Sequence, residues 1–130
     1  MIGGMHRLLS APDKTRLRRL TEAIERETGV EIAVLVVRRA DDAPALARGY
    51  FNHVGIGKHG RDNGVLVLVA VDNRAIHIEL GRGLSGVVDP ADAQRIIDHV
   101  IAPQFRRGRF GDGLIRGVEA IGHLARRAAT

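Results

Sequence analysis

The chain contains no cysteine and no tryptophan, and it has few aromatic residues of any kind. Without cysteine it can form no disulfide, no thiolate nucleophile and no zinc–thiolate site. The aromatic residues are limited to one tyrosine and three phenylalanines, Tyr50, Phe51, Phe105 and Phe110. The core of the folded protein must therefore be built from aliphatic side chains.

Long hydrophobic runs are also missing. A membrane-spanning helix needs roughly 20 consecutive apolar residues, and no stretch of the chain approaches that length. The first residues, Met1 to Leu9, are too few and too polar for a secretory signal. These absences predict a chain without a membrane span and a cytoplasmic location. An envelope-facing location stays open if the chain is a trimmed piece of a longer protein.

Positive charge is the feature that the chain has in excess. Its 130 residues carry a net charge of +5, and every basic residue except Lys14 and Lys58 is an arginine. Such a surface attracts anionic partners, which include nucleic acid, a membrane surface and phosphate. The arginines are scattered in short pairs, which is also typical of an ordinary solvated surface. No nucleic-acid-binding motif accompanies them, so a basic nucleic-acid-binding domain is the weakest alternative.

Length and composition predict one globular domain over residues 1–130, because 45% of the residues are hydrophobic. The centre of this domain is the stretch from Phe51 to Gly86, which contains two predicted strands. Val65 to Val71 is apolar throughout, which is typical of a central strand buried on both faces. Ala75 to Leu80 follows a short turn and alternates between apolar and polar residues, which predicts a half-solvated hairpin strand.

Helical periodicity surrounds these strands. We predict four helices: Ala11 to Thr28, Pro44 to Val54, Pro90 to a stop at Pro103, and a last one after a turn at Gly111 to Gly113. In the second helix, Leu46, Tyr50 and Val54 form one apolar stripe. A further strand is predicted over Val30 to Val37. A helix between two strands implies a parallel pair with a right-handed connection, and the hairpin strand then runs antiparallel. The expected fold is α/β, a small three-layer α/β/α sandwich whose mixed sheet has one parallel pair plus an antiparallel hairpin strand.

This topology brings acidic residues to one edge of the sheet, where strand starts and strand ends meet: Glu31, Asp62, Glu79, Asp89 and Asp92. Hard cations such as Ca²⁺ take carboxylate and carbonyl oxygens from flexible loops, and two glycine loops flank this edge. We select Asp62, Glu79 and Asp89 as candidate ligands of a weakly bound Ca²⁺. The alternative is structural, because Asp62 also fits a turn and Asp89 also fits a helix N-cap.

The second glycine loop, Gly81 to Gly86, has the spacing G-x-G-x-x-G after a strand. A dinucleotide-binding motif would lead through a helix to a second parallel strand, but no strand follows the next predicted helix. We therefore predict no nucleotide site, and instead an anion held by backbone amides near Gly83 with Arg82 beside them. Ser85 lacks the last glycine of a nucleophile elbow, so no catalytic residue is assigned.

The block from Gly55 to Leu66, G-I-G-K-x-G-x-D-N-G-V-L, resembles the core of the TPM domain family, and the similarity covers almost the whole chain. The family includes bacterial envelope proteins and a thylakoid acid phosphatase. The resemblance implies the same α/β/α layering and supports a divalent cation at the acidic edge. Ser85, Pro90 and Arg109 stand where family members tend to have acidic residues, so weak binding is expected.

Two functions follow from the resemblance. The first is a binding or accessory module of unsettled activity, which acts on a protein partner such as a component of a membrane-associated complex. The second is a metal-assisted phosphatase acting on phosphate esters. Arg61 and Arg82 would then hold the phosphate, and Asp62 would serve as metal ligand or base. The missing acidic residues favour the first function.

Overall fold

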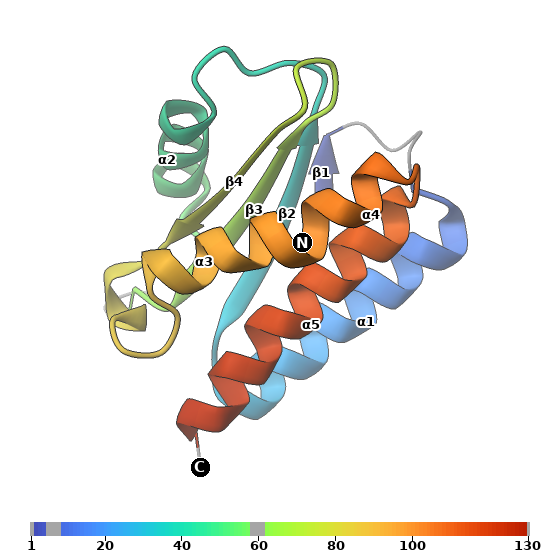
Figure 1. Cartoon of the computed structure of the whole chain (residues 1–130). Helices are drawn as coiled ribbons and strands as arrows, with labels where there is room; N and C mark the ends of the chain where they lie inside the picture. The colour runs from blue at the N-terminus through green and yellow to red at the C-terminus, as the bar shows by residue number, and fades with distance from the viewer. Residues whose placement is uncertain (1, 5–8, 58–61, 130) are drawn as a thin grey trace.

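The computed structural model of the chain describes residues 2–4, 9–57 and 62–129. In these ranges the strands are β1 (Ile2–Gly4), β2 (Glu31–Val37), β3 (Gly64–Ala70) and β4 (Ala75–Leu80). The helices are α1 (Ala11–Thr28), α2 (Ala43–Val54), the short 3₁₀ helix η1 (Arg82–Leu84), α3 (Pro90–Ile96), the π-helical segment η2 (Ile97–Ile101), α4 (Ala102–Arg106) and α5 (Phe110–Ala129). Figure 1 shows their arrangement.

The strands form one mixed sheet in the order β1-β2-β3-β4. β2 and β3 are parallel and β4 returns antiparallel to β3, so the predicted parallel pair and hairpin strand are confirmed. The sheet has in addition β1, which is parallel to β2 and was not predicted. Its sequence, Ile-Gly-Gly, is short and two-thirds glycine, a residue that is depleted in strands.

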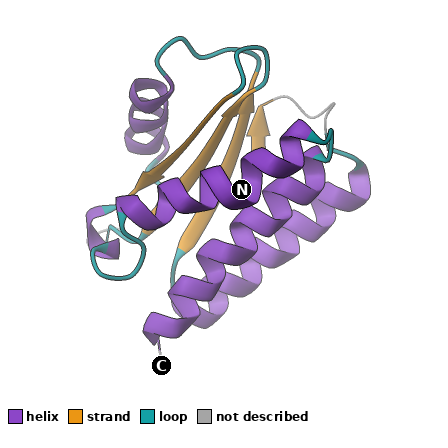
Figure 2. Ribbon diagram, in the orientation of Figure 1, coloured by secondary structure: helices purple, strands orange, loops and turns teal. Residues whose placement is uncertain are grey.

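Helices cover both faces of this sheet, as Figure 1 and Figure 2 show. α2 packs against β3 and β4 on one face, and α1 and α5 lie side by side on the other. Alternation along β3 divides its side chains between two hydrophobic clusters: Val65 and Val67 belong to the larger one, with α1 and α5, and Leu66 and Leu68 to the smaller one, with α2. The predicted three-layer α/β/α sandwich is therefore confirmed, with β3 buried along its whole length.

Short local signals set the helix boundaries. The hydroxyl of Ser10 accepts the N–H of Asp13 at 3.2 Å and caps α1. Gly29 ends the same helix in the left-handed conformation, with φ of 79°. Both predicted ends of α1 are confirmed. Asp42 caps α2 by accepting the N–H of Ala45 at 3.1 Å, and this helix begins one residue earlier than predicted.

Pro103 does not end the third helix, so this prediction was wrong. α3 continues through η2 and α4, past Pro103, to Arg106. In an α-helix the proline ring would collide with the carbonyl four residues earlier. The preceding π-helical turn joins the N–H of Ala102 to the carbonyl of Ile97, five residues back, and this wider turn makes room for the ring.

The predicted turn at Gly111 to Gly113 was also wrong, because both glycines lie in the first turn of α5. They are needed there for close packing rather than for a turn. A Cβ at position 111 would collide with the carboxylate of Asp13, and one at position 113 would lie 2.7 Å from the ring of Phe105. The start of α5 therefore packs tightly against α1 and α4.

The stripe of large apolar residues predicted for α2 is not its buried face. Ala43 and Ala47 are the buried residues of this helix, whereas Leu46 and Val54 keep 40% and 43% of their surface exposed. Small side chains let the helix axis come close to the sheet. α2 is thus held by the close approach of its alanines, and Tyr50 and Phe51 pack against the same cluster from the side.

Candidate functional site

One edge of the sheet collects the starts of β2 and β3 and the end of β4, as the sequence predicts. Glu31 lies opposite Gly64 in the parallel pair. The N–H of Gly81, which follows β4, donates to the carbonyl of Gly64 at 2.9 Å. The loops before β3 and after β4 are therefore neighbours at this edge.

These loops pack backbone against backbone. A Cβ at Gly57 would lie 2.7 Å from the backbone N of Gly64, and one at Gly64 would lie 2.7 Å from the carbonyl carbon of Ile56. A Cβ at Gly81 would lie 2.8 Å from the carbonyl carbon of Asp62. Real Cβ atoms do not approach other atoms this closely, so each position requires glycine.

Asp62 is presented outward by this framework. Its backbone has a φ of 53°, a left-handed conformation that aspartate and asparagine adopt more readily than other side chains. Its carbonyl accepts the N–H of Gly83 at 2.9 Å, which fixes the loop against η1. The side chains of Asp62 and Arg82 are both exposed.

Asn63, the next residue, has a structural role. Its side-chain amide donates to the carbonyl of Gly29, and its own carbonyl accepts the N–H of Glu31 at 3.2 Å. Both contacts tie the loop before β3 to the turn between α1 and β2. In the Asp62-Asn63-Gly64 block, therefore, only the first side chain points to solvent.

Glu79 lies on the α2 face of β4, because strand alternation puts it there with His77. Its Oε1 lies 2.9 Å from Nε2 of His77, and its Oε2 lies 4.0 Å from Nε of Arg48 on α2. The two strand side chains are largely buried, with 26% and 21% of their surface exposed. Glu79 is thus held by basic groups within its own layer. The sequence had placed His77 and Glu79 on one face, whereas the approach of Arg48 depends on how α2 crosses β4.

Asp89 caps the start of α3. Its carboxylate accepts the N–H of Gly86 at 2.9 Å, and its own N–H donates to the carboxylate of Asp92 at 3.0 Å. The second contact is half of a capping box between Asp89 and Asp92, and the first ties the preceding loop to the cap. Val88 and Ala93 on either side belong to the larger hydrophobic cluster, so the cap lies in the layer of α1 and α5.

The sheet therefore separates two of the candidate ligands. Glu79 is on the α2 face, while Asp89 is on the opposite face and Asp62 lies in a loop at the edge. In the described ranges, no three His, Asp or Glu side chains come together as a group that could hold a metal ion. The three carboxylates do not fit one ligand set, and the Ca²⁺ site stays a prediction.

Backbone amides of the second glycine loop are already used within the protein. The N–H groups of Gly83, Leu84, Ser85, Val87 and Val88 donate to backbone carbonyls at 2.8–3.3 Å. The Gly83 amide predicted to bind an anion thus serves the carbonyl of Asp62. An anion at this loop would depend on the exposed side chain of Arg82, because Arg61 lies outside the described residues.

Comparison with known proteins settles the family. The family model of the TPM domain matches residues 5–124. The chain belongs to the TPM domain family. The resemblance found in the sequence is therefore confirmed. No curated protein matches this TPM domain.

Solved structures share the fold of this TPM domain. The N-terminal domain of a protein from P. gingivalis superposes with a TM-score of 0.89 and 28% identity, over 98% of this chain and 83% of that one. The BA42 protein from the psychrophilic bacterium Bizionia argentinensis gives 0.80 and 27%, over 92% and 82%. The N-terminal domain of the cg2496 protein from Corynebacterium glutamicum gives 0.74 over 99% and 79%, and at 12% identity it shows the fold alone.

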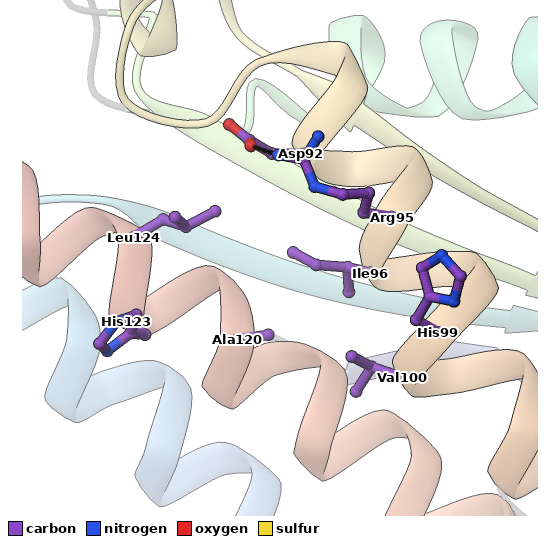
Figure 3. A pocket seen from close by; sticks show the side chains of 8 residues that line it. All are labelled: Asp92, Arg95, Ile96, His99, Val100, Ala120, His123 and Leu124. Carbon is purple, nitrogen blue, oxygen red and sulfur yellow. Dashed lines mark hydrogen bonds and ion pairs between the residues drawn. The ribbon is translucent and has the colours of Figure 1, made fainter.

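A pocket of about 390 Å³ opens elsewhere on the TPM domain, between α3–η2 and α5. Figure 3 shows the side chains that line it: Asp92, Arg95, Ile96, His99, Val100, Ala120, His123 and Leu124. Asp92 and Arg95 form an ion pair on its α3 side. The pocket contains none of the residues selected as ligands, and it adjoins the cap of α3 through Asp92, whose carboxylate accepts the N–H of Asp89.

Proposed function

We propose that this TPM domain is a binding or accessory module that contacts a protein partner through its glycine-rich edge, residues 55–57, 62–64 and 81–89. The backbone-on-backbone packing of these loops carries the proposal, because it needs glycine at positions 57, 64 and 81. Loops held this rigidly by the scaffold are where proteins place binding residues.

The groups that this edge presents suit a polar protein surface. Asp62, Arg82 and Ser85 are exposed, and the hydrogen bond from the Gly83 amide to the Asp62 carbonyl brings the backbones beside the acidic and the basic side chain together. Mixed charges of this kind favour a specific partner over a uniformly anionic one. A component of a membrane-associated complex is the partner that the family suggests. No helix in the described part of the chain is long and apolar enough to cross a bilayer.

A divalent cation at this edge would depend mainly on Asp62. Glu79 is held by His77, and Asp89 is used in the helix cap. Because Glu79 and Asp89 are engaged within the protein, we expect a dissociation constant for Ca²⁺ on the order of 0.1–1 mM, as in weak calcium modules.

A calcium titration followed by amide NMR tests the cation. Saturable shifts confined to residues 62–64 and 81–89, lost in Asp62→Asn, would support it. The matched control is Asp72→Asn, a half-exposed carboxylate in the hairpin turn after β3, which should leave the titration unchanged. An unchanged spectrum up to several millimolar Ca²⁺ would remove the cation from the proposal.

Co-purification with a paired set of variants tests the contact with a partner. A protein retained by the wild type should be lost with Arg82→Glu at the glycine-rich edge. It should be retained with Arg38→Glu, an exposed arginine directly after β2. Equal retention by both variants would contradict the proposed surface.

Metal-assisted phosphatase chemistry is the second candidate, and the exposed Arg82 supports it, because the next residue, Gly83, is hydrogen-bonded to the carbonyl of Asp62. Phosphate held by an arginine is a common arrangement in such sites. Turnover of p-nitrophenyl phosphate is the test, with and without a chelator. Hydrolysis that falls with chelator and with Asp62→Asn would favour the enzyme over the binding module.

A further inference from the structure

β4 is an edge strand that has no proline, lysine or bulge and carries one carboxylate, Glu79. Within the described ranges it pairs only with β3. Natural edge strands are commonly guarded by proline, lysine or a bulge, but β4 is Ala-Ile-His-Ile-Glu-Leu and pairs without a bulge. Figure 1 shows it at the outer side of the sheet. An open strand of this kind is a template for another strand.

The hydrogen-bonding pattern determines which residues face outward. The N–H of Gly81 donates to the carbonyl of Gly64, and these residues are opposite each other in the ladder that pairs Leu66 with Glu79. Bonded pairs alternate along an antiparallel ladder, so His77 and Glu79 turn their backbone groups toward β3. Ile76, Ile78 and Leu80 therefore turn theirs toward the free edge.

We propose that the free side of β4 binds a second copy of the chain. The β4 strands of the two copies would pair antiparallel around a two-fold axis at Ile78. Such a contact is isologous, with the same strand on both sides. Ile78 then faces the partner's Ile78, and Ile76 faces the partner's Leu80. Between these bonded pairs, His77 lies directly opposite the partner's Glu79.

Charge complementarity selects this register. The residues that turn their backbone groups outward are even-numbered, so hydrogen bonds can form only in registers that place an even-numbered residue opposite an even-numbered residue of the partner. The next register on one side would place His77 opposite the partner's His77, and the next on the other side would place Glu79 opposite the partner's Glu79. The register centred on Ile78 is the one that pairs each histidine with a carboxylate and overlaps the whole strand.

The geometry within one copy already supports this pairing. Nε2 of His77 lies 2.9 Å from Glu79 of its own strand, and Arg48 lies 4.0 Å from the other oxygen of that carboxylate. Non-bonded cross-strand positions bring side chains closest. Each carboxylate would therefore stand between its own imidazole and that of the partner, and alternating groups of this kind stabilise strand pairing.

Sedimentation of charge variants tests the dimer. The apparent mass of the wild type should rise from 14.1 kDa toward twice that value as its concentration increases from micromolar to millimolar. His77→Glu places two carboxylates opposite each other at two symmetric positions and should weaken association roughly tenfold. The swapped double variant, His77→Glu with Glu79→His, should restore it. A monomer at every concentration would overturn the proposal, and so would a double variant no better than the single one.

Introduced cysteines test the register, since the chain has none of its own. His77→Cys mixed with Glu79→Cys should give a disulfide-linked dimer faster than either variant alone, because only the mixture places two thiols opposite each other. Thermal melts of each variant control for folding. Fastest cross-linking of His77→Cys with itself would show a different register and overturn the pairing.

Discussion

Gly81→Ala should destabilise the fold even though alanine suits the backbone conformation there. Gly81 has φ of −70° and ψ of 154°, which any residue adopts, so the substitution adds only a methyl group. That methyl would lie 2.8 Å from the carbonyl carbon of Asp62 and 3.2 Å from the N of Gly64. Overpacking of this kind costs about 1–3 kcal/mol, and displacing the loop also weakens the bond from Gly83 to Asp62, worth about 1 kcal/mol. Reduced freedom of the unfolded chain returns about 0.5 kcal/mol, which leaves a net loss of about 1.5–3.5 kcal/mol.

Two other glycines provide controls for this prediction. Gly86 has φ of 80° with nothing within 4 Å of its Cβ position, so Gly86→Ala introduces backbone strain alone, about 1 kcal/mol. Gly49 lies within α2 with equally open space, so Gly49→Ala should stabilise the protein by about 0.5–1 kcal/mol. Urea denaturation of the three variants measures the series. A Gly81→Ala variant no less stable than Gly86→Ala would refute the backbone packing on which the proposed function rests.

Three further predictions concern the core and the helix caps. Val67→Asp should prevent folding, because it puts an unpaired charge in the most buried strand, and a cooperative melt near that of the wild type would contradict this. Asp89→Ala should cost about 1 kcal/mol through the lost cap, measured by calorimetry with and without Ca²⁺; a loss seen only with Ca²⁺ would indicate a ligand instead. Gln104→Met should raise the unfolding free energy by about 1 kcal/mol, because Oε1 of Gln104 is buried without a hydrogen-bond partner in the described structure, and urea denaturation showing a loss would speak against it.

The sheet could be predicted where side-chain pattern and burial agree. The unbroken apolar run of β3 and the alternation of β4 determine their places, and a helix between β2 and β3 leaves only the parallel arrangement. β1 was not predicted because two of its three residues are glycine, which gives no strand signal. The helix end predicted at Pro103 and the turn predicted at Gly111 were wrong because proline and glycine disfavour a helix only when the surrounding structure does not accommodate them. Here a π-helical turn accommodates Pro103 within a helix, and close packing against Asp13 favours glycine at position 111.

The candidate site could be predicted as far as the edge of the sheet, and the Ca²⁺ there stays a prediction. The topology correctly placed Asp62, Glu79 and Asp89 near one edge of the sheet. It did not show that Glu79 and Asp89 lie on opposite faces of the sheet at that edge. The alternation that identified β4 as half-solvated also places Glu79 beside α2, away from the start of α3. Contacts such as that of Arg48 depend on helix crossing, which no local pattern of residues encodes.

The Asp62-Asn63-Gly64 block shows how a family signature can combine function with folding. Gly64 leaves room for Ile56, and Asn63 ties the loop to Gly29, so replacing either changes the framework as well as any binding. Asp62 is different, because its side chain is exposed and its φ of 53° is one that asparagine also adopts. Asp62→Asn therefore removes the charge while leaving the backbone in place. It is the substitution in this block that separates what the edge binds from how the edge folds.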